Sequence, residues 1–222
     1  MTVIELEKIG KTYGKGESAT QALSNVSLKI EEGEFWSIMG PSGSGKSTLL
    51  NILGCMDVPT EGNYFLKGEK INDYTAKQLS RVRNQTISFV FQQFALLNEY
   101  SVYDNIELPL FCRKLSRKER RERIDYYMKR LGIEGLGKKK PTQISGGQQQ
   151  RAAIARALVT EADIILADEP TGALDQKTGA ELMGLLQEIN EEGKTILLVT
   201  HDEKVADCAK RRLYIEDGKS RK

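Results

Sequence analysis

The chain has 222 residues, of which 39% are hydrophobic and 29% are charged, as in an ordinary globular protein with a real core. Its 33 basic and 31 acidic residues give a formal net charge of +2, and this near balance gives no reason to expect a nucleic-acid partner. No segment reaches the roughly 18 apolar residues of a membrane span, and the charged first residues do not resemble a signal peptide.

The first thirty residues predict antiparallel strands. Apolar side chains recur over residues 3–9 and again over residues 22–30, with a polar stretch over residues 14–21 between them. Short apolar repeats that flank a polar, glycine-containing stretch are typical of a pair of strands and their connection.

Three later apolar runs predict buried strands of a parallel sheet: Phe35–Met39, Ile164–Ala167 and Thr195–Thr200. Each run is rich in Ile, Leu or Val and is followed at once by polar, glycine or charged residues. Ligands of open α/β sheets bind beyond the carboxyl ends of such strands, so the residues after each run are candidates for a site.

A phosphate-binding motif follows the first of these runs. The segment from Gly40 to Ser47 matches G-x-x-x-x-G-K-[S/T] and leads into a helical pattern over residues 47–53. Glycines allow successive backbone N–H groups to point at phosphate oxygens, and the helix adds the positive end of its dipole. Lys46 is expected to reach the β- and γ-phosphates, and Ser47 to bind Mg²⁺. The predicted nucleotide-binding residues here are Gly40, Pro41, Ser42, Gly43, Ser44, Gly45, Lys46, Ser47 and Thr48.

The alternative for this motif is a glycine-rich turn without function, which the strand before it and the helix after it disfavour. The motif by itself indicates only a nucleotide, because kinases, GTPases and many ATPases share it.

Between about residues 93 and 144 the pattern changes to helices, with apolar residues at helical spacing within Leu115–Leu131. Strand patterns resume only afterwards, which predicts an inserted helical subdomain. The basic run Arg113–Arg130 is interleaved with Glu and is expected to be a solvated helix face. The alternative is contact with a membrane protein or with anionic lipid. The last four residues, 219–222, are expected to form a frayed tail.

Two carboxylates end the second parallel strand. Asp168 is placed to hold Mg²⁺ through water. Glu169 is placed to polarise an attacking water as general base, a role typically worth about 10²–10⁴-fold in rate. An isolated Asp-Glu after a strand is commonly only an acidic turn, but beside a complete phosphate loop it indicates hydrolysis.

A second candidate anion site is the segment Ile144–Arg151, which reads Ile-Ser-Gly-Gly-Gln-Gln-Gln-Arg and precedes an alanine-rich helix over residues 152–158. A helix start of this kind presents free N–H groups and a serine hydroxyl. An ordinary serine N-cap explains as much without any function.

This segment resembles the signature motif of ABC transporter ATPases, L-S-G-G-Q, with Ile144 in place of the usual leucine. It precedes the Asp168 strand by about the separation that the family shows. Gln92 resembles the Q-loop glutamine of the family, which contacts Mg²⁺ and the attacking water. The run Gly172–Asp175 resembles the D-loop, with glycine where serine is more common.

Two further residues fall in the order of the family's motifs. His201, the only histidine, follows the third parallel strand and resembles the switch histidine that touches the γ-phosphate. Tyr13 resembles the A-loop aromatic that stacks on adenine, an interaction worth about 1–3 kcal/mol for a stacked base. The alternatives are a structural histidine and an ordinary strand-end tyrosine.

The resemblance covers nearly the whole chain and implies an α/β fold: a P-loop NTPase (RecA-like) core with a mainly parallel sheet, an N-terminal antiparallel β subdomain and an inserted α-helical subdomain. We expect a single domain over residues 1–222. Residues 1–92 and 160–222 would form the β subdomain and core, and residues 93–159 the helical subdomain with the signature motif.

The resemblance also implies ATP and Mg²⁺ as cofactors and a head-to-tail homodimer in which each ATP lies between two chains. The implied catalytic residues are Lys46, Gln92, Glu169 and His201; the implied metal-binding residues are Ser47, Gln92 and Asp168; and the implied residues acting on the partner's ATP are Ser145, Gly146, Gly147 and Gln148.

Within the family, the run Gly54–Gly62 together with residues 144–151 and 167–175 resembles the MacB/LolD/FtsE type. That type implies a separate integral-membrane permease, a place on the cytoplasmic face of the cell membrane, and export or extraction of macrolide, peptide or lipoprotein-like substrates. A periplasmic or membrane-fusion adaptor is a further partner that the type allows.

Three other classes of protein fit the sequence less well. DNA-repair and chromosome-organising ATPases carry long coiled coils between the two nucleotide motifs, and here that gap holds no sustained heptads. A small-molecule P-loop kinase gives no reason for Ser145–Gln148. A non-hydrolytic regulatory module gives no reason for Glu169 and His201.

Overall fold

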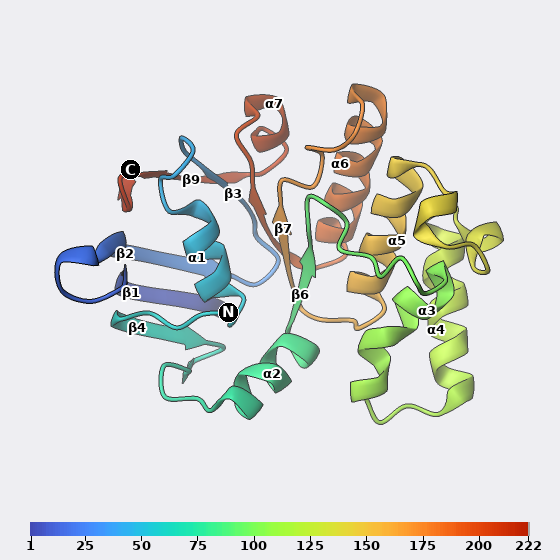
Figure 1. The fold of residues 1–222 in the computed structure, drawn as a ribbon, viewed down its shortest axis with the longest axis horizontal. Coiled ribbons are helices and arrows are strands. Elements are labelled where there is room, and N and C mark those ends of the chain that lie inside the picture. Colours follow the sequence, from blue (N-terminus) through green and yellow to red (C-terminus); the bar gives the residue numbers. More distant parts are fainter. Residues whose placement is uncertain (222) are drawn as a thin grey trace.

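The computed structural model describes residues 1–221 and consists of two sheets with helices around them (Figure 1). The strands are β1 (Thr2–Tyr13), β2 (Thr20–Glu31), β3 (Phe35–Met39), β4 (Glu61–Leu66), β5 (Glu69–Lys70), β6 (Ile87–Val90), β7 (Ile164–Asp168), β8 (Thr195–Val199), β9 (Arg211–Glu216) and β10 (Lys219–Arg221). The α-helices are α1 (Lys46–Leu53), α2 (Ala76–Gln85), α3 (Val102–Glu107), α4 (Arg117–Arg130), α5 (Gly146–Leu158), α6 (Gln176–Glu191) and α7 (Glu203–Ala206). Short 3₁₀ turns lie at residues 16–18, 108–112, 134–136 and 141–143.

The N-terminal sheet is antiparallel, as the alternating pattern predicted. Its order is β2-β1-β4-β5, and β1 pairs with β2 along most of its length. Inward side chains such as Ile4, Leu6 and Ile30 are buried, while charged side chains such as Glu5 and Lys29 point outward. One apolar and one polar face are typical of an antiparallel sheet that covers a core on one side.

The second sheet has the order β10-β9-β3-β8-β7-β6, and all its pairs are parallel except β9 with β10. The three predicted parallel strands are therefore confirmed as β3, β7 and β8. The frayed tail expected at the C-terminus is wrong for residues 219–221, which pair with β9 as β10. The polar side chains of this segment are compatible with an edge strand as well as with a tail, because β10 has a neighbouring strand on one side only. Residue 222 lies outside the described part.

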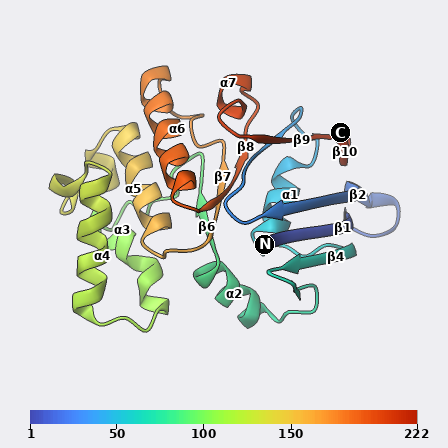
Figure 2. The ribbon, with the colours of Figure 1, turned by 180° about the vertical axis from the view of Figure 1, so that it is seen from behind.

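Between β6 and β7 the chain forms α3, α4 and α5, which confirms the predicted helical insert. Figure 2 shows these helices grouped at one end of the molecule, away from the antiparallel sheet. The helices begin at capping residues: Ser101, Ser116 and Ser145 each accept a hydrogen bond from the backbone N–H three residues later. Such caps satisfy amide groups that have no partner within the helix.

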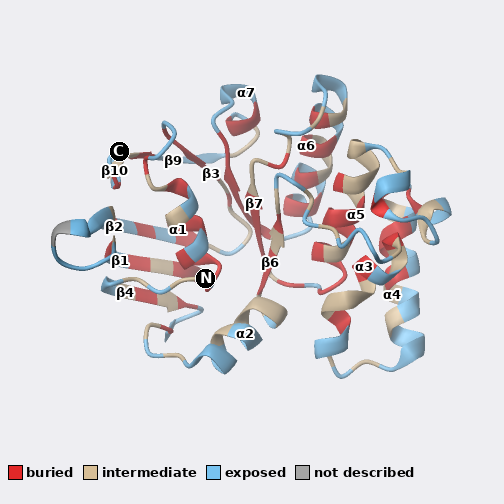
Figure 3. Ribbon diagram, viewed as in Figure 1, coloured by how far each residue is buried: buried red, intermediate tan, exposed pale blue. Residues whose placement is uncertain are grey.

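Two apolar clusters flank the parallel sheet (Figure 3). One joins the sheet to the antiparallel sheet and to α1 through residues such as Ile38, Leu49 and Ile52. The other joins it to the inserted helices and α6 through residues such as Ile124 and Leu186. Burial on both faces explains why β3, β7 and β8 are almost continuously apolar. Over residues 1–221, none of the helices combines the length and apolarity needed to cross a membrane.

Candidate active site

The parallel register brings the ends of four strands to one edge of the sheet. Asp168, the last residue of β7, pairs with Val199 of β8, which in turn pairs with Ile38 of β3. Ala167 pairs with Val90 of β6. The residues at and after these strand ends therefore lie along the same edge of the sheet. They include the phosphate-binding loop, the two carboxylates, His201 and Gln92.

In the loop after β3, the backbone conformation and the close surroundings at two positions allow only glycine. Gly40 has φ +145°, and a Cβ there would lie 1.9 Å from the carbonyl oxygen of Ile215. Gly45 has φ +104°, and a Cβ there would lie 2.6 Å from the carbonyl oxygen of Ala22. Gly45 is also the N-cap of α1, so no side chain caps the first amides of this helix. Uncapped amides at a helix start are suited to a phosphate.

A concavity of about 460 Å³ lies against this loop and is lined by Gly43, Lys46, Ser47 and Thr48 together with residues of β2 and the β9–β10 turn. The turn also supports the loop from behind, because the Gly218 amide donates to the carbonyl of Ser44 at 3.0 Å. The C-terminal hairpin is thus part of the phosphate-binding structure, which sequence reasoning did not foresee.

Lys46 folds back over its own loop. Its ammonium donates to the carbonyls of Gly40 at 2.8 Å and Pro41 at 2.7 Å, and the side chain is largely buried. Pro41, Ser42 and Gly43 are exposed, whereas the Ser44 side chain is buried and its Oγ makes no hydrogen bond among the described residues. The loop therefore surrounds the concavity with backbone amides and one cation, a combination that binds phosphate.

Glu169 lies between the ends of β7 and β8. Its backbone has φ +44°, and its amide donates to the carbonyl of Val199. Its Oε1 lies 2.7 Å from His201 Nδ1, and its Oε2 accepts a hydrogen bond from Thr200 Oγ1 at 3.4 Å. His201 is exposed, while Glu169 is largely covered. The predicted base and the predicted switch histidine are therefore in direct contact. Thr200, which sequence reasoning missed, adds a second contact.

Asp168 is half-buried beside these groups. Burial raises the pKa of its carboxyl, the negative charge of Glu169 raises this pKa further, and Lys46 opposes the shift. Lys46 and Asp168 are thus close enough to influence each other, although Lys46 begins α1 and Asp168 ends β7. A carboxylate destabilised in this way gains from a cation.

Gln92 follows β6 and is exposed. Its amide packs against Gly172, because a Cβ at that residue would lie 2.7 Å from Gln92 Nε2. The glycine at the position where the D-loop usually has serine thus leaves room for the Q-loop side chain. Hydroxyl, carboxylate and amide oxygens are the ligands that Mg²⁺ prefers, so Ser47, Asp168 and Gln92 have the chemistry of a magnesium site.

Tyr13 ends β1 beside the phosphate-binding loop. Burial and the hydrogen bond to Asp57 raise the pKa of its phenol, and the nearby Thr48 side chain opposes this shift. The residue is 42% exposed, which leaves surface for an aromatic ligand.

The signature segment begins α5, where Ser145 and Gln148 form a capping box: Gln148 N donates to Ser145 Oγ at 3.3 Å and Ser145 N to Gln148 Oε1 at 3.0 Å. In Figure 1, α1 and α5 lie on opposite sides of β7. Among residues 1–221, no hydrogen bond joins Ser145–Gln148 to the phosphate-binding loop. These residues therefore stand apart from the other predicted site residues of the same chain.

Two contacts that sequence reasoning missed connect α5 to the active-site edge. The buried Gln150 donates from Nε2 to the carbonyl of Pro170 at 2.8 Å. Arg156 donates to the carbonyls of Phe94 and Ala95, two residues with positive φ that follow the Q-loop glutamine. The partners are 20 and 61 or 62 residues apart in the chain, so no local pattern indicates them.

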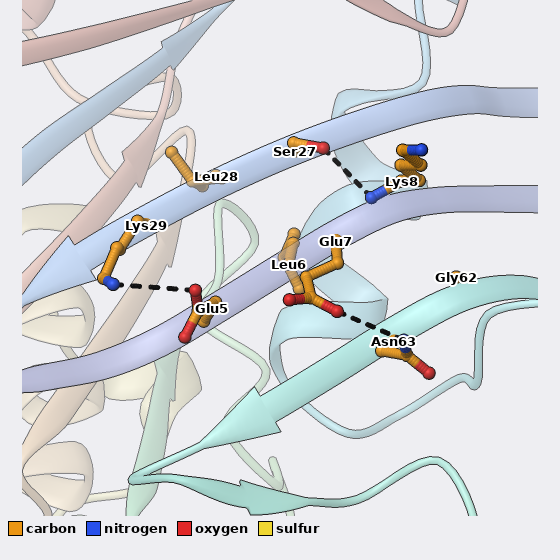
Figure 4. A pocket seen from close by; sticks show the side chains of 9 residues that line it. All are labelled: Glu5, Leu6, Glu7, Lys8, Ser27, Leu28, Lys29, Gly62 and Asn63. Carbon is orange, nitrogen blue, oxygen red and sulfur yellow. Dashed lines mark hydrogen bonds and ion pairs between the residues drawn. The ribbon is translucent and has the colours of Figure 1, made fainter.

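Another concavity, of about 740 Å³, lies elsewhere, on the outer face of the antiparallel sheet (Figure 4). Two polar pairs are already formed among its lining residues, Lys29 with Glu5 and Asn63 with Glu7. It contains none of the predicted site residues, and its shape follows from the bulged pairing of β1. We assign the chemistry to the sheet edge instead.

Comparison with known proteins agrees with this geometry. The family model described as ABC transporter matches residues 23–172. The ABC transporter ATP-binding protein MJ0796 of Methanocaldococcus jannaschii is 52% identical over 221 residues, 97% of this chain and 94% of that protein. YknY of Bacillus subtilis, also described as an ABC transporter ATP-binding protein, is 48% identical with the same coverage of both chains.

The macrolide export ATP-binding/permease protein MacB of Mannheimia succiniciproducens is 45% identical over 98% of this chain, but the chain spans only 34% of that protein. Among solved structures, the dimeric post-hydrolysis state of MJ0796 bound to ADP and Pi superposes with a TM-score of 0.91 at 49% identity, covering 99% of this chain and 97% of the other.

Proposed function

The chain belongs to the ABC transporter family and is an ABC ATPase, and from this premise we propose that it hydrolyses ATP to drive a separate membrane permease of the MacB/LolD/FtsE type. The observation that carries the proposal is the meeting of a phosphate-binding loop with Asp168, Glu169 and His201 at one sheet edge. The permease would keep this chain at the cytoplasmic face of the cell membrane and would bind the substrate. We propose that the substrate is a macrolide, a peptide or a lipoprotein-like molecule, which the permease exports or extracts. An adaptor protein on the far side would complete the assembly.

We propose the following division of the chain: residues 1–92 and 160–222 as the antiparallel sheet and nucleotide-binding core, and residues 93–159 as the helical subdomain. The arrangement separates the loop that binds the phosphates from the helix α5 that begins with Ser145. The core would then carry the catalytic residues, and the helical subdomain would carry the signature motif.

In the proposed mechanism, Lys46 leaves the carbonyls of Gly40 and Pro41 and turns to the β- and γ-phosphates. Bound Mg²⁺, held by Ser47, Asp168 and Gln92, would neutralise phosphate charge. Glu169 accepts the proton of the attacking water, and His201, which already contacts its Oε1, orients that carboxylate and faces the γ-phosphate. Tyr13 would stack on the adenine.

Ser145, Gly146, Gly147 and Gln148 would act on the ATP of a second copy. The MJ0796 structures are dimeric, and one of them holds ADP and Pi. In a head-to-tail dimer of this chain, the amides at the start of α5 would face the γ-phosphate held by the partner's loop. ATP that bridges two surfaces binds the closed dimer better than either open half, and so shifts the population toward closure.

The variant Glu169→Gln tests the proposed function. We expect steady-state phosphate release to fall by about 10²–10⁴-fold, because the amide cannot accept a proton from water. ATP binding should persist, so the variant should elute as a dimer in ATP during size-exclusion chromatography. Glu188→Gln, the same change at an exposed site on α6, serves as the control and should hydrolyse ATP normally. Normal turnover by Glu169→Gln, or a variant that stays monomeric in saturating ATP, would contradict the proposal.

A further inference from the structure

A buried lysine, a carboxylate and the candidate adenine-stacking tyrosine form a closed cluster at the end of β1. Lys11 and Tyr13 come from β1, and Asp57 comes from the loop that follows α1. Tyr13 Oη donates to Asp57 Oδ2 at 2.8 Å, and Lys11 Nζ donates to Asp57 Oδ1 at 2.5 Å. The carboxylate thus connects the two side chains of the strand. We call Lys11, Asp57 and Tyr13 the β1 clasp.

Asp57 itself is held in place on both sides. Its Oδ1 also accepts a hydrogen bond from the Val58 amide at 2.7 Å, and Lys11 Nζ reaches the carbonyl of Val58 at 2.7 Å. Burial alone would raise the pKa of Asp57, but the hydrogen bonds from Lys11 and Tyr13 outweigh it and lower this pKa. The carboxylate is therefore ionised at neutral pH, and each oxygen has a fixed partner.

Lys11 is an unusual residue to bury. Its side chain is only 9% exposed, and its ammonium lies 4.9 Å from the centroid of the Tyr13 ring. Lysine is almost never buried without a compensating partner, and Asp57 supplies that partner. The ammonium lies over one face of the ring, a cation–π arrangement, so a flat ligand would have to stack on the other face.

We infer that Lys11 and Asp57 are positioning residues that hold the Tyr13 ring ready to stack on the nucleobase before nucleotide binds. This inference rests on the proposed role of Tyr13 in the nucleotide site. A tyrosine on an exposed strand end otherwise samples several rotamers, and ordering it would cost binding free energy. The β1 clasp lowers that cost, because Asp57 holds the phenol hydroxyl and Lys11 holds one face of the ring.

We predict that the β1 clasp contributes to binding of the base and does not contribute to binding of the phosphates. Tyr13→Phe keeps the ring but removes the hydrogen bond to Asp57. We expect its affinity for ADP to fall about 3- to 10-fold, the range that follows from freeing one side chain. Its affinity for pyrophosphate, which has no base, should not change. The KM for ATP should rise by a similar factor at unchanged kcat, since the clasp acts on binding only.

The experiment measures binding of ADP and of pyrophosphate by calorimetry, each with Mg²⁺, to the full chain and its variants. Tyr74→Phe is the matched control, because its hydroxyl donates to Glu69 in a similar exposed pair away from the site. Asp57→Ala should weaken ADP binding at least as much as Tyr13→Phe does, because it also removes the partner of Lys11. Adding Tyr13→Phe to Asp57→Ala should cost nothing more, because the hydrogen bond between Tyr13 and Asp57 is then already absent. Thermal unfolding checks that each variant is folded.

The outcomes separate this inference from the proposed function. If Tyr13→Ala binds ADP as well as the wild type does, Tyr13 does not stack on the base and its proposed role fails. If Tyr13→Ala weakens ADP binding but Tyr13→Phe does not, the tyrosine stacks and the clasp is overturned. Equal losses for ADP and pyrophosphate in Tyr13→Phe would also overturn it, because they indicate a general disturbance of the loop.

Discussion

Asp168 shows how one residue is prepared for a cation at the expense of stability. It is half-buried beside Glu169, and both burial and that neighbouring charge raise its pKa. A raised pKa in the folded state means that the fold favours the protonated form. The stabilising contribution of Asp168 is therefore complete below its unfolded-state pKa and is lost as the pH rises through its folded-state pKa. At neutral pH the ionised carboxylate destabilises the fold until a cation arrives.

We predict that Asp168→Asn raises the midpoint of thermal unfolding at pH 7 in the absence of nucleotide and metal. Asparagine has nearly the same shape but no charge to bury. The difference from the wild type should shrink as the pH falls toward 4, because the wild-type carboxyl then becomes protonated. Scanning calorimetry between pH 4 and pH 8 measures this trend. Asp73→Asn, on the exposed loop before α2, is the control. A destabilised Asp168→Asn at pH 7 would refute the account.

The clasp shows the limit of sequence reasoning at the residue scale. The site residues after β3, β7 and β8 were predictable, because motif spacing and strand ends place them together. Lys11 and Asp57 are 46 residues apart, and nothing local distinguishes a lysine that becomes buried from one that stays in water. Thr200 and Gln150 were missed for the same reason. Each acts through a tertiary contact.

At the scale of elements, α5 has a cap that stabilises the helix and that we propose also acts in the dimer. Ser145 accepts the Gln148 amide, so its hydroxyl stabilises the helix, and the proposed role in the dimer uses the same hydroxyl. We predict that Ser145→Ala lowers the free energy of unfolding by about 1 kcal/mol, the usual cost of losing a cap. It should also abolish most ATP hydrolysis.

A matched cap separates these two effects. Ser116 caps α4 through the same kind of capping box with Glu119, in the same helical insert. Ser116→Ala should lose a similar free energy of unfolding, measured in urea, and yet keep its ATPase activity. Equal loss of activity in both variants would mean that Ser145 acts only through the stability of the helical insert.

The elements themselves were predictable where burial leaves a clear pattern. β3, β7 and β8 are buried on both faces, and their Ile, Leu and Val runs reveal them. β6 has only four residues, one of them Ser88, and α2 buries no residue fully, so neither has a strong period. β10 is a polar edge strand that resembles a tail. Short or exposed elements are stabilised by contacts with elements distant in the chain, and no local sequence pattern shows these contacts.

At the scale of the whole molecule, the two segments that we propose as halves of an ATP site do not meet within the chain. Lys46 begins α1 and Ser145 caps α5, and these two helices lie on opposite sides of β7 (Figure 1). A head-to-tail dimer would unite each half with the complementary half of the partner. Two isologous copies then give two equal sites, as twofold symmetry requires.

Mixing two inactive variants tests this arrangement. Glu169→Gln lacks the base, and Ser145→Ala lacks the signature hydroxyl. In a mixed dimer one site contains both defects, and the other contains neither. We therefore predict that the mixture hydrolyses ATP although neither variant alone does, measured as phosphate release against mixing ratio. A mixture as inactive as its components would place Ser145 and Glu169 in the same site.

The backing of the phosphate-binding loop has a consequence for synthesis of the protein. The motif is translated early, at residues 40–47, but Gly40 packs against Ile215 and the Ser44 carbonyl takes its hydrogen bond from Gly218. A nascent chain that has passed the motif thus lacks the support that shapes it until nearly all the β9–β10 hairpin has left the ribosome. The loop would then be able to bind a triphosphate only once the hairpin is in place, so a nascent chain that lacks the hairpin should not bind nucleotide.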